Sequence, residues 1–193
     1  RGVAGGVYAP SGKAVPVDGG YRVSGRWAFA SGAEHCSWLM GGSVIIENGA
    51  PRLLPNGAPD APLMLFPAAD VEVIDTWTVS GLRGTGSHDI AVRALLVPAD
   101  RAVSLVRDRP RERGPLYAFP AFGLLAIGIA AVALGIARRA IDELVQLAGG
   151  KTPTGSRRIL AVRQVVQVQV SEAEALLRSG RAFLFDAVGT AWE

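Results

Sequence analysis

The hydrophobic pattern of this chain changes once, between residues 100 and 120, and that change limits the fold more than any other feature. Before it, short β-branched and aromatic runs alternate with Gly, Pro, Asn and Asp, as in all-β domains. After it, apolar residues recur at helical spacing. A charged, Pro-containing linker at 107–114 joins the two patterns. We therefore expect an α+β chain with segregated parts, a β domain over residues 1–106 and helices over 107–193.

The first part contains six candidate strands. In Asp18-Gly19-Gly20 the glycines allow a tight turn, and the residues that follow alternate apolar with polar as a half-buried strand does. Other turn signals, such as Asn48-Gly49 and Asn56-Gly57, separate the later runs. The number and spacing of these strands predict a barrel or sandwich. The strands are expected at residues 21–24, 27–30, 38–46, 63–66, 71–77 and 90–97.

The second part predicts two long helices. The first spans residues 121–148, and Gly149-Gly150 is expected to end it in the left-handed conformation. The second spans about 158–187 and carries apolar residues at three-, four- or seven-residue steps on one face. We expect the pair to form an antiparallel hairpin, the first part of an α-helical bundle.

Residues 119–137 contain no charged side chain, and this stretch is long enough for a membrane span. However, the stretch holds Pro120 and three glycines and is richer in Ala than in Leu. A helix buried on all sides in a bundle or oligomer explains the same composition, and we favour that interpretation over a membrane helix. It also implies partners, because a hairpin alone cannot cover such a helix.

Composition excludes several classes of protein. The 193 residues carry a net charge of only +3 and the arginines are scattered, so nothing indicates a nucleic-acid binder. The single cysteine, Cys36, excludes an internal disulfide, and without a Cys/His cluster no metal site is expected. A reducing cytoplasm is the simplest location. Because the chain begins at Arg1 and ends in a helical pattern, we expect an internal fragment of a longer protein.

Residues 19–32, GGYRVSGRWAFASG, resemble a segment of the middle domain of the acyl-CoA dehydrogenase superfamily. In that family a G-x-x-L-N-G-x-K-x-W-I-T-N segment places its Trp and Thr against the flavin. Aligning the shared glycine with Gly25 puts Phe29 and Ser31 at those two positions. The W-x-F-A-S-G version is similar to the branch of oxygenase components from two-component flavin monooxygenases, such as 4-hydroxyphenylacetate hydroxylase.

Two further segments resemble the family. Residues 81–89, GLRGTGSHD, followed by Val97-Pro98, are similar to its G-x-R-G-S-x-T segment and later V-P. Residues 160–178 resemble a helix with a Q-x-x-Q pair, here Gln164 and Gln167. The segment that carries the catalytic glutamate of true dehydrogenases lies beyond this sequence, so the dehydrogenase function cannot be read from it.

The resemblance implies a set of site residues. On a strand, Phe29 and Ser31 would point to the same side, one as a ring contact and the other as a hydroxyl or amide donor near flavin N5 and O4. Trp27 shares that side and could belong to the core instead. The residues expected to contact the flavin are Phe29, Ala30, Ser31, Gly32 and Gln164, and those expected to contact substrate are Thr85, Ser87 and His88, with His88 also a candidate catalytic proton donor or acceptor.

Each of these assignments has a simpler alternative. The alternation around Phe29 also suits core packing, the glycine-rich stretch 81–88 suits an ordinary turn, and His88 or His35 suits a structural or surface histidine. The basic pair Arg157-Arg158 suits a solvated loop.

The function that the resemblance implies is a flavin-dependent monooxygenase that uses O2 and reduced flavin, FAD or FMN, from a separate reductase. It would act on a small-molecule substrate as a homodimer or homotetramer. The alternatives are an acyl-CoA dehydrogenase acting on a CH–CH group and a non-catalytic, truncated subunit. The substrate cannot be identified from the sequence.

Overall fold

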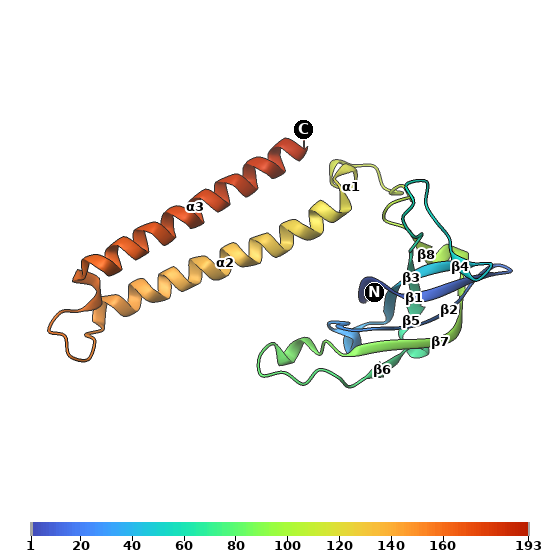
Figure 1. Ribbon diagram of the computed structural model, residues 1–193, viewed down its shortest axis with the longest axis horizontal. Helices are drawn as coiled ribbons and strands as arrows, with labels where there is room; N and C mark the ends of the chain where they lie inside the picture. The colour runs from blue at the N-terminus through green and yellow to red at the C-terminus, as the bar shows by residue number, and fades with distance from the viewer. Residues whose placement is uncertain (1, 193) are drawn as a thin grey trace. The chain divides into compact units, whose positions relative to one another are not determined.

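A computed structural model describes residues 2–192 and divides into two compact units, Arg1–Arg109 and Pro110–Glu193 (Figure 1). The first unit contains a mixed β-sheet and the second contains long helices. The expected α+β class, with strands preceding helices, is therefore confirmed.

The eight strands of the first unit form one sheet in the order β6-β7-β2-β1-β3-β5-β8, and β4 pairs with β3. The strands β1 and β3 run parallel, and the other pairs are antiparallel. The strands are β1 (Ala4–Val17), β2 (Gly20–Trp27), β3 (Trp38–Glu47), β4 (Ala50–Pro51), β5 (Leu63–Pro67), β6 (Glu72–Ile74), β7 (Asp89–Pro98) and β8 (Ala102–Val103).

Five of the six predicted strands are present as β2, β3, β5, β6 and β7, although β6 is shorter than predicted. The predicted strand at 27–30 is wrong: β2 ends at Trp27, and Phe29 has a φ of 64°, which lies outside the extended region. Three strands were not predicted. The longest of them, β1, contains two glycines near its start and two prolines, all of which are signals of turns rather than strands.

The core of the sheet is built around Trp27, which is fully buried and packs on Phe66 with ring centroids 5.6 Å apart. The indole Nε1 donates a hydrogen bond to the Gly42 carbonyl oxygen at 2.7 Å. Three glycines make room for the indole, since a Cβ atom at Gly12, Gly25 or Gly41 would lie within 2.8 Å of its ring atoms. Trp27 is thus a core residue and does not share a face with Phe29.

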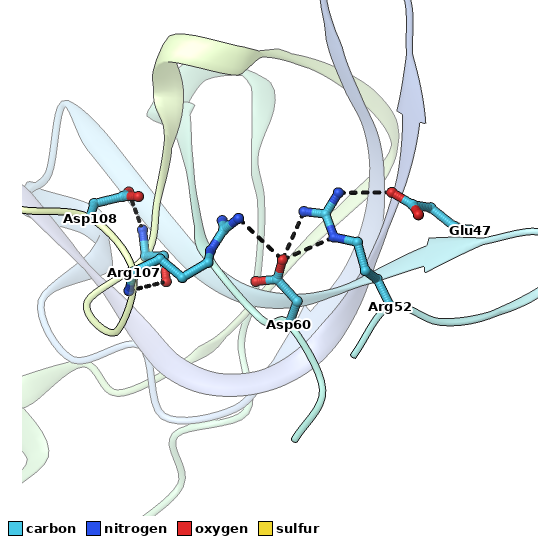
Figure 2. A network of polar contacts seen from close by, with 6 residues as sticks. Glu47, Arg52, Asp60, Arg107 and Asp108 are labelled. Carbon is cyan, nitrogen blue, oxygen red and sulfur yellow. Dashed lines mark hydrogen bonds and ion pairs between the residues drawn. The ribbon is translucent and has the colours of Figure 1, made fainter. Parts of the chain in front are cut away.

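A buried carboxylate holds the chain where it leaves the sheet (Figure 2). Asp60, whose side chain is 3% exposed, accepts hydrogen bonds from Arg52 at 2.8 and 3.0 Å and pairs with Arg107 at 3.3 Å. Arg52 also reaches Glu47 at 2.8 Å. Just beyond Arg107, the Asp108 carboxylate accepts a hydrogen bond from the Ser104 backbone amide at 2.7 Å. These contacts fix the last residues of the first unit against the loop that follows β4.

The second unit is a helical hairpin. After the short α1 (Pro115–Ala118), α2 (Ala121–Gly150) and α3 (Gln164–Trp192) lie side by side and run in opposite directions (Figure 1). The predicted glycine cap is wrong, because Gly149 and Gly150 are both helical and the helix is capped by the extended residue Lys151. The second helix begins six residues later than predicted, after a 3-10 turn at Leu160–Val162.

The hairpin leaves most of its apolar side chains exposed. In the described part of α2 only Ile141 and Ala148 are buried, and in α3 no described residue is buried. By length and composition α2 could cross a membrane, and none of its most apolar window is buried within this chain. The exposed apolar side chains include Leu125, Ile129, Val132, Ile136, Leu176 and Phe183.

Candidate functional site

Two segments that resemble the flavoprotein family lie together at one end of the sheet. They follow β2 and precede β7, which pair antiparallel with Trp27 opposite Ile90. Beyond the strands, the Ala30 amide donates to the His88 carbonyl at 2.9 Å and the Gly32 amide to the Thr85 carbonyl at 2.8 Å. The β2–β7 ladder therefore positions a joint loop cluster that contains every predicted site residue of the first unit.

Phe29 lies at the exposed side of this cluster. Its side chain is 70% exposed, an unusual state for a large aromatic ring, and its backbone adopts the left-handed conformation. The ring meets Trp77 edge to face, with centroids 6.1 Å apart and planes at 84°. Strain and exposure at one aromatic residue indicate a position shaped for contact with something outside this chain segment.

The Ser31 hydroxyl is the outer end of a chain of hydroxyl groups. Ser31 Oγ lies 2.8 Å from Ser87 Oγ, which lies 2.7 Å from Thr85 Oγ1. Thr85 Oγ1 donates to the Leu82 carbonyl at 2.9 Å. Ser31 is exposed, whereas Ser87 is only 5% exposed. This row of hydrogen-bonded hydroxyl groups therefore leads from the surface into the loop cluster.

The backbone amides around Ser31 are already paired. Besides the bonds of Ala30 and Gly32, the Ser31 amide donates to the Phe29 carbonyl at 2.9 Å and closes a three-residue turn. Of the two donors that the resemblance implied at this position, a hydroxyl or an amide, the amide is therefore already used, because the backbone differs from the predicted strand and pairs all three amides internally.

His88 pins a neighbouring loop to the cluster. The amides of Thr76 and Trp77 both point at its Nδ1, at 3.2 and 3.3 Å. The Asp75 carboxylate also lies 3.2 Å from this nitrogen, but its side chain is 91% exposed, and the two amides can only donate. Nδ1 therefore acts as an acceptor, so a role of His88 toward a ligand would use Nε2.

Two residues of the cluster were missed by sequence reasoning. Leu82 has a φ of 55° and a 78% exposed side chain, and its carbonyl accepts hydrogen bonds from Thr85 and from Trp77 Nε1 at 3.1 Å. Trp77 stands against Phe29. No sequence pattern predicts left-handed backbone at a leucine. Trp77 was missed because the pattern of 71–77 predicted a strand rather than a loop.

The loop after β6 is also tied to the start of β7 by charge. Arg26 lies 2.7 Å from the Asp89 carboxylate, which in turn accepts a hydrogen bond from the Thr76 hydroxyl at 3.0 Å. The hydrogen bond from Arg26, with a smaller contribution from Thr76, holds the pKa of Asp89 below its usual range. The loop that carries Trp77 is thus held by a pair at the end of the β2–β7 ladder.

The remaining predicted cofactor residue, Gln164, lies in the second unit at the first turn of α3, where it is exposed. It borders a polar groove with Ser156, Arg158 and Arg163. The structure therefore brings together the seven predicted residues of the first unit, whereas Gln164 belongs to the second unit. Among residues 2–192, no group of three or more His, Cys, Asp or Glu side chains could hold a metal ion.

Comparisons with known proteins agree with this arrangement. Residues 127–193 match the family model described as acyl-CoA dehydrogenase, C-terminal domain. The whole chain has the fold of solved members of that superfamily: it matches 3-HSA hydroxylase from Rhodococcus sp. RHA1 with a TM-score of 0.82 and 30% identity over 98% of this chain and 48% of that one. The resemblance to the acyl-CoA dehydrogenase superfamily is thereby confirmed.

The relatives also identify the branch. Indole-3-acetate monooxygenase from Pseudomonas putida is 35% identical over 98% of this chain and 46% of its own length. XiaF from Streptomyces, solved with FADH2 and glycerol, matches with a TM-score of 0.75 and 28% identity over 98% of this chain and 50% of that one. The chain is thus similar to flavin-dependent monooxygenases and spans about half the length of the relatives it matches.

Proposed function

We propose that the protein is the oxygenase component of a flavin-dependent monooxygenase, which uses reduced FAD or FMN and O2 to hydroxylate a small molecule. The similarity to named monooxygenases supports this proposal. Bound reduced flavin would supply the electrons that activate oxygen. The acyl-CoA dehydrogenase alternative has less support, since relatives such as indole-3-acetate monooxygenase are oxygenases.

The observation that carries the proposal is the joint loop cluster, in which an exposed aromatic ring and an exposed hydroxyl lie two residues apart. The residues fit an isoalloxazine, which needs an apolar contact for its ring and a polar contact at its N5 edge. Phe29 would supply the ring contact, and Trp77 would fix its orientation from behind. Ser31 would supply the polar contact.

The other residues of the cluster would position these two. Ser87 is buried and reaches only neighbouring hydroxyl groups, so we assign it to orienting Ser31 rather than to touching substrate. Thr85 and the Nε2 side of His88 are the remaining groups that could face a substrate. His88 also holds the loop that carries Trp77.

The exposed apolar surfaces are the basis for what we propose about the rest of the assembly. We propose that the sheet is the barrel-like middle domain of the family and that α2 and α3 belong to a larger helical bundle, which would cover their apolar faces in a homodimer or homotetramer. Gln164 would face the cofactor of this assembly. A separate flavin reductase in the cytoplasm would supply the reduced flavin.

The proposal is tested by titrating the full-length polypeptide with reduced FAD and FMN under anaerobic conditions. Ser31→Ala should weaken binding roughly fivefold, the effect of losing one hydrogen bond of about 1 kcal/mol. Phe29→Ala should weaken it separately through lost ring contact. Ser179→Ala, an exposed serine on α3, is the matched control.

Admitting O2 to the reduced complex should then give a hydroxylated aromatic product from a panel of phenols and indoles. Reduction of the bound oxidised flavin by an acyl-CoA without added reductant would instead establish the dehydrogenase function. Flavin binding that neither Ser31→Ala nor Phe29→Ala alters would show that the site lies elsewhere.

A further inference from the structure

We infer that Ser87 and Thr85 hold the Ser31 hydroxyl as a hydrogen-bond acceptor, so that the site selects reduced flavin, which carries an N–H at N5, over oxidised flavin, which does not. This inference rests on the proposed function. It assigns the preference for a redox state to two residues that lie behind the contact residue.

The direction of the hydroxyl chain follows from its inner end. A carbonyl oxygen can only accept, so the bond from Thr85 to Leu82 uses the one proton of the Thr85 hydroxyl. Thr85 Oγ1 must then accept at 2.7 Å from Ser87, and Ser87 must accept at 2.8 Å from Ser31. The proton of Ser31 therefore points inward, and only its lone pairs face outward.

Burial of Ser87 maintains this direction of the hydrogen bonds between the hydroxyl groups. Ser87 is 5% exposed, so its hydroxyl has no solvent partner to which it could turn. The nearby amides of Ala30, Ser31 and Gly32 are all paired with carbonyls. The cluster thus presents an acceptor next to Phe29 and no free main-chain donor within residues 30–32.

The two redox states of flavin differ at the atom that would meet this acceptor. In oxidised flavin N5 carries a lone pair, and two acceptors facing each other repel. In reduced flavin N5 carries a hydrogen and can donate to Ser31. A typical hydrogen bond corresponds to about fivefold in affinity, so we expect the reduced form to bind at least that much more tightly through this contact.

Ser87→Ala tests the inference in the full-length polypeptide. Without its inner acceptor, the Ser31 proton is free to turn outward and donate to oxidised flavin. The ratio of the oxidised to the reduced dissociation constant should fall about fivefold, which lowers the midpoint potential of the bound flavin by about 20 mV at roughly 30 mV per tenfold for a two-electron couple. Thr85→Val should shift the ratio in the same direction.

Ser43→Ala is the matched control, since Ser43 is also a buried serine of the sheet and its hydroxyl bonds to the nearby Gly41 carbonyl rather than to another hydroxyl. It should leave the ratio unchanged. A loss of stability alone would weaken both redox forms equally, so the ratio separates orientation of Ser31 from a merely structural role of Ser87.

Four results would overturn the inference. Equal affinity of the unaltered protein for the two redox forms, or an unchanged ratio in both Ser87→Ala and Thr85→Val, would refute it while leaving the flavin site in place. Neutron diffraction of the ligand-free protein gives a test independent of flavin: the deuterium on Ser31 should point at Ser87 Oγ, and an outward orientation would refute it. Failure of the unaltered protein to bind either form would reject the proposed function as well.

Discussion

Single glycines decide the packing of the sheet as much as the large side chains do. Trp27 fits because three residues around its indole lack a Cβ atom. The sequence suggested two roles for Trp27, flavin contact or core, and could not choose between them. The choice depends on the φ angle of Phe29, which turns the chain out of the sheet two residues after Trp27. No sequence pattern predicts this angle at a phenylalanine.

Gly41→Ala should destabilise the first unit by about 1–3 kcal/mol, the usual cost of overpacking a core. The new methyl group would lie 2.4 Å from a ring atom of Trp27, whose rotation is prevented by its bond to the Gly42 carbonyl. Urea unfolding followed by tryptophan fluorescence measures the effect. Gly81→Ala, at an open position with ordinary backbone, should change stability little. Equal stability of the two variants would contradict this account of the core.

At the scale of elements, the sequence predicted most strands and both long helices because these have clear periodicity. It missed β1, whose glycines and prolines are signals of turns, and it predicted a separate strand over 27–30 where the chain leaves the sheet. The candidate site was predicted as two separate segments through a family resemblance. What periodicity could not supply is their joining by hydrogen bonds across the end of the β2–β7 ladder, which depends on tertiary structure.

An ion pair links the two long helices. The Glu174 carboxylate of α3 accepts hydrogen bonds from Arg178 at 2.8 Å and from Arg138 of α2 at 2.5 Å. These bonds, first that of Arg178 and then that of Arg138, lower the pKa of Glu174 below its ordinary value of 4.5. A lowered carboxyl pKa stabilises the folded state above the ordinary value, and the stabilisation is lost as the pH falls through the folded value.

Thermal unfolding from about pH 6 to pH 3 should therefore show a difference between the unaltered protein and Glu174→Gln that shrinks toward acid. Glu172→Gln is the control, since Glu172 is exposed on the same helix and makes no ion pair among the described residues. A constant difference for Glu174→Gln across this pH range would show that the carboxylate does not stabilise the hairpin through its charge.

For the whole molecule, the apolar surface of the hairpin is larger than two helices can bury. Only Ile141 and Ala148 are buried in α2, and large side chains such as Leu125, Ile129 and Phe183 are exposed. Contiguous apolar surface of this kind is typical of regions that contact another protein or a membrane. The sequence predicted partners from the uncharged stretch alone, but it could not identify them, because the pattern shows which residues are apolar and not which surface covers them.

The chain expressed alone should associate with itself in light scattering, and charged substitutions at Ile129 and Ile136 should reduce the association without unfolding the sheet. Both side chains are exposed in α2, at 76% and 66%. A charged substitution at Gln169, an exposed polar residue of α3, should have little effect on the association. A monodisperse monomer at high concentration would contradict the interface, and insertion into lipid vesicles would favour a membrane helix.

The pairing of β2 with β7 sets an order for synthesis at the ribosome. Trp27 finds its ladder partner only when Ile90 is made, and the sheet gains its last antiparallel pair with Val103 of β8. At about 5–20 residues per second, the nascent chain waits roughly 4–14 s between the ends of β2 and β7 with an open sheet edge. The apolar α2 follows only afterwards. The two aggregation-prone features of this protein are therefore exposed one after the other during synthesis, first an unpaired strand and then an uncovered helix.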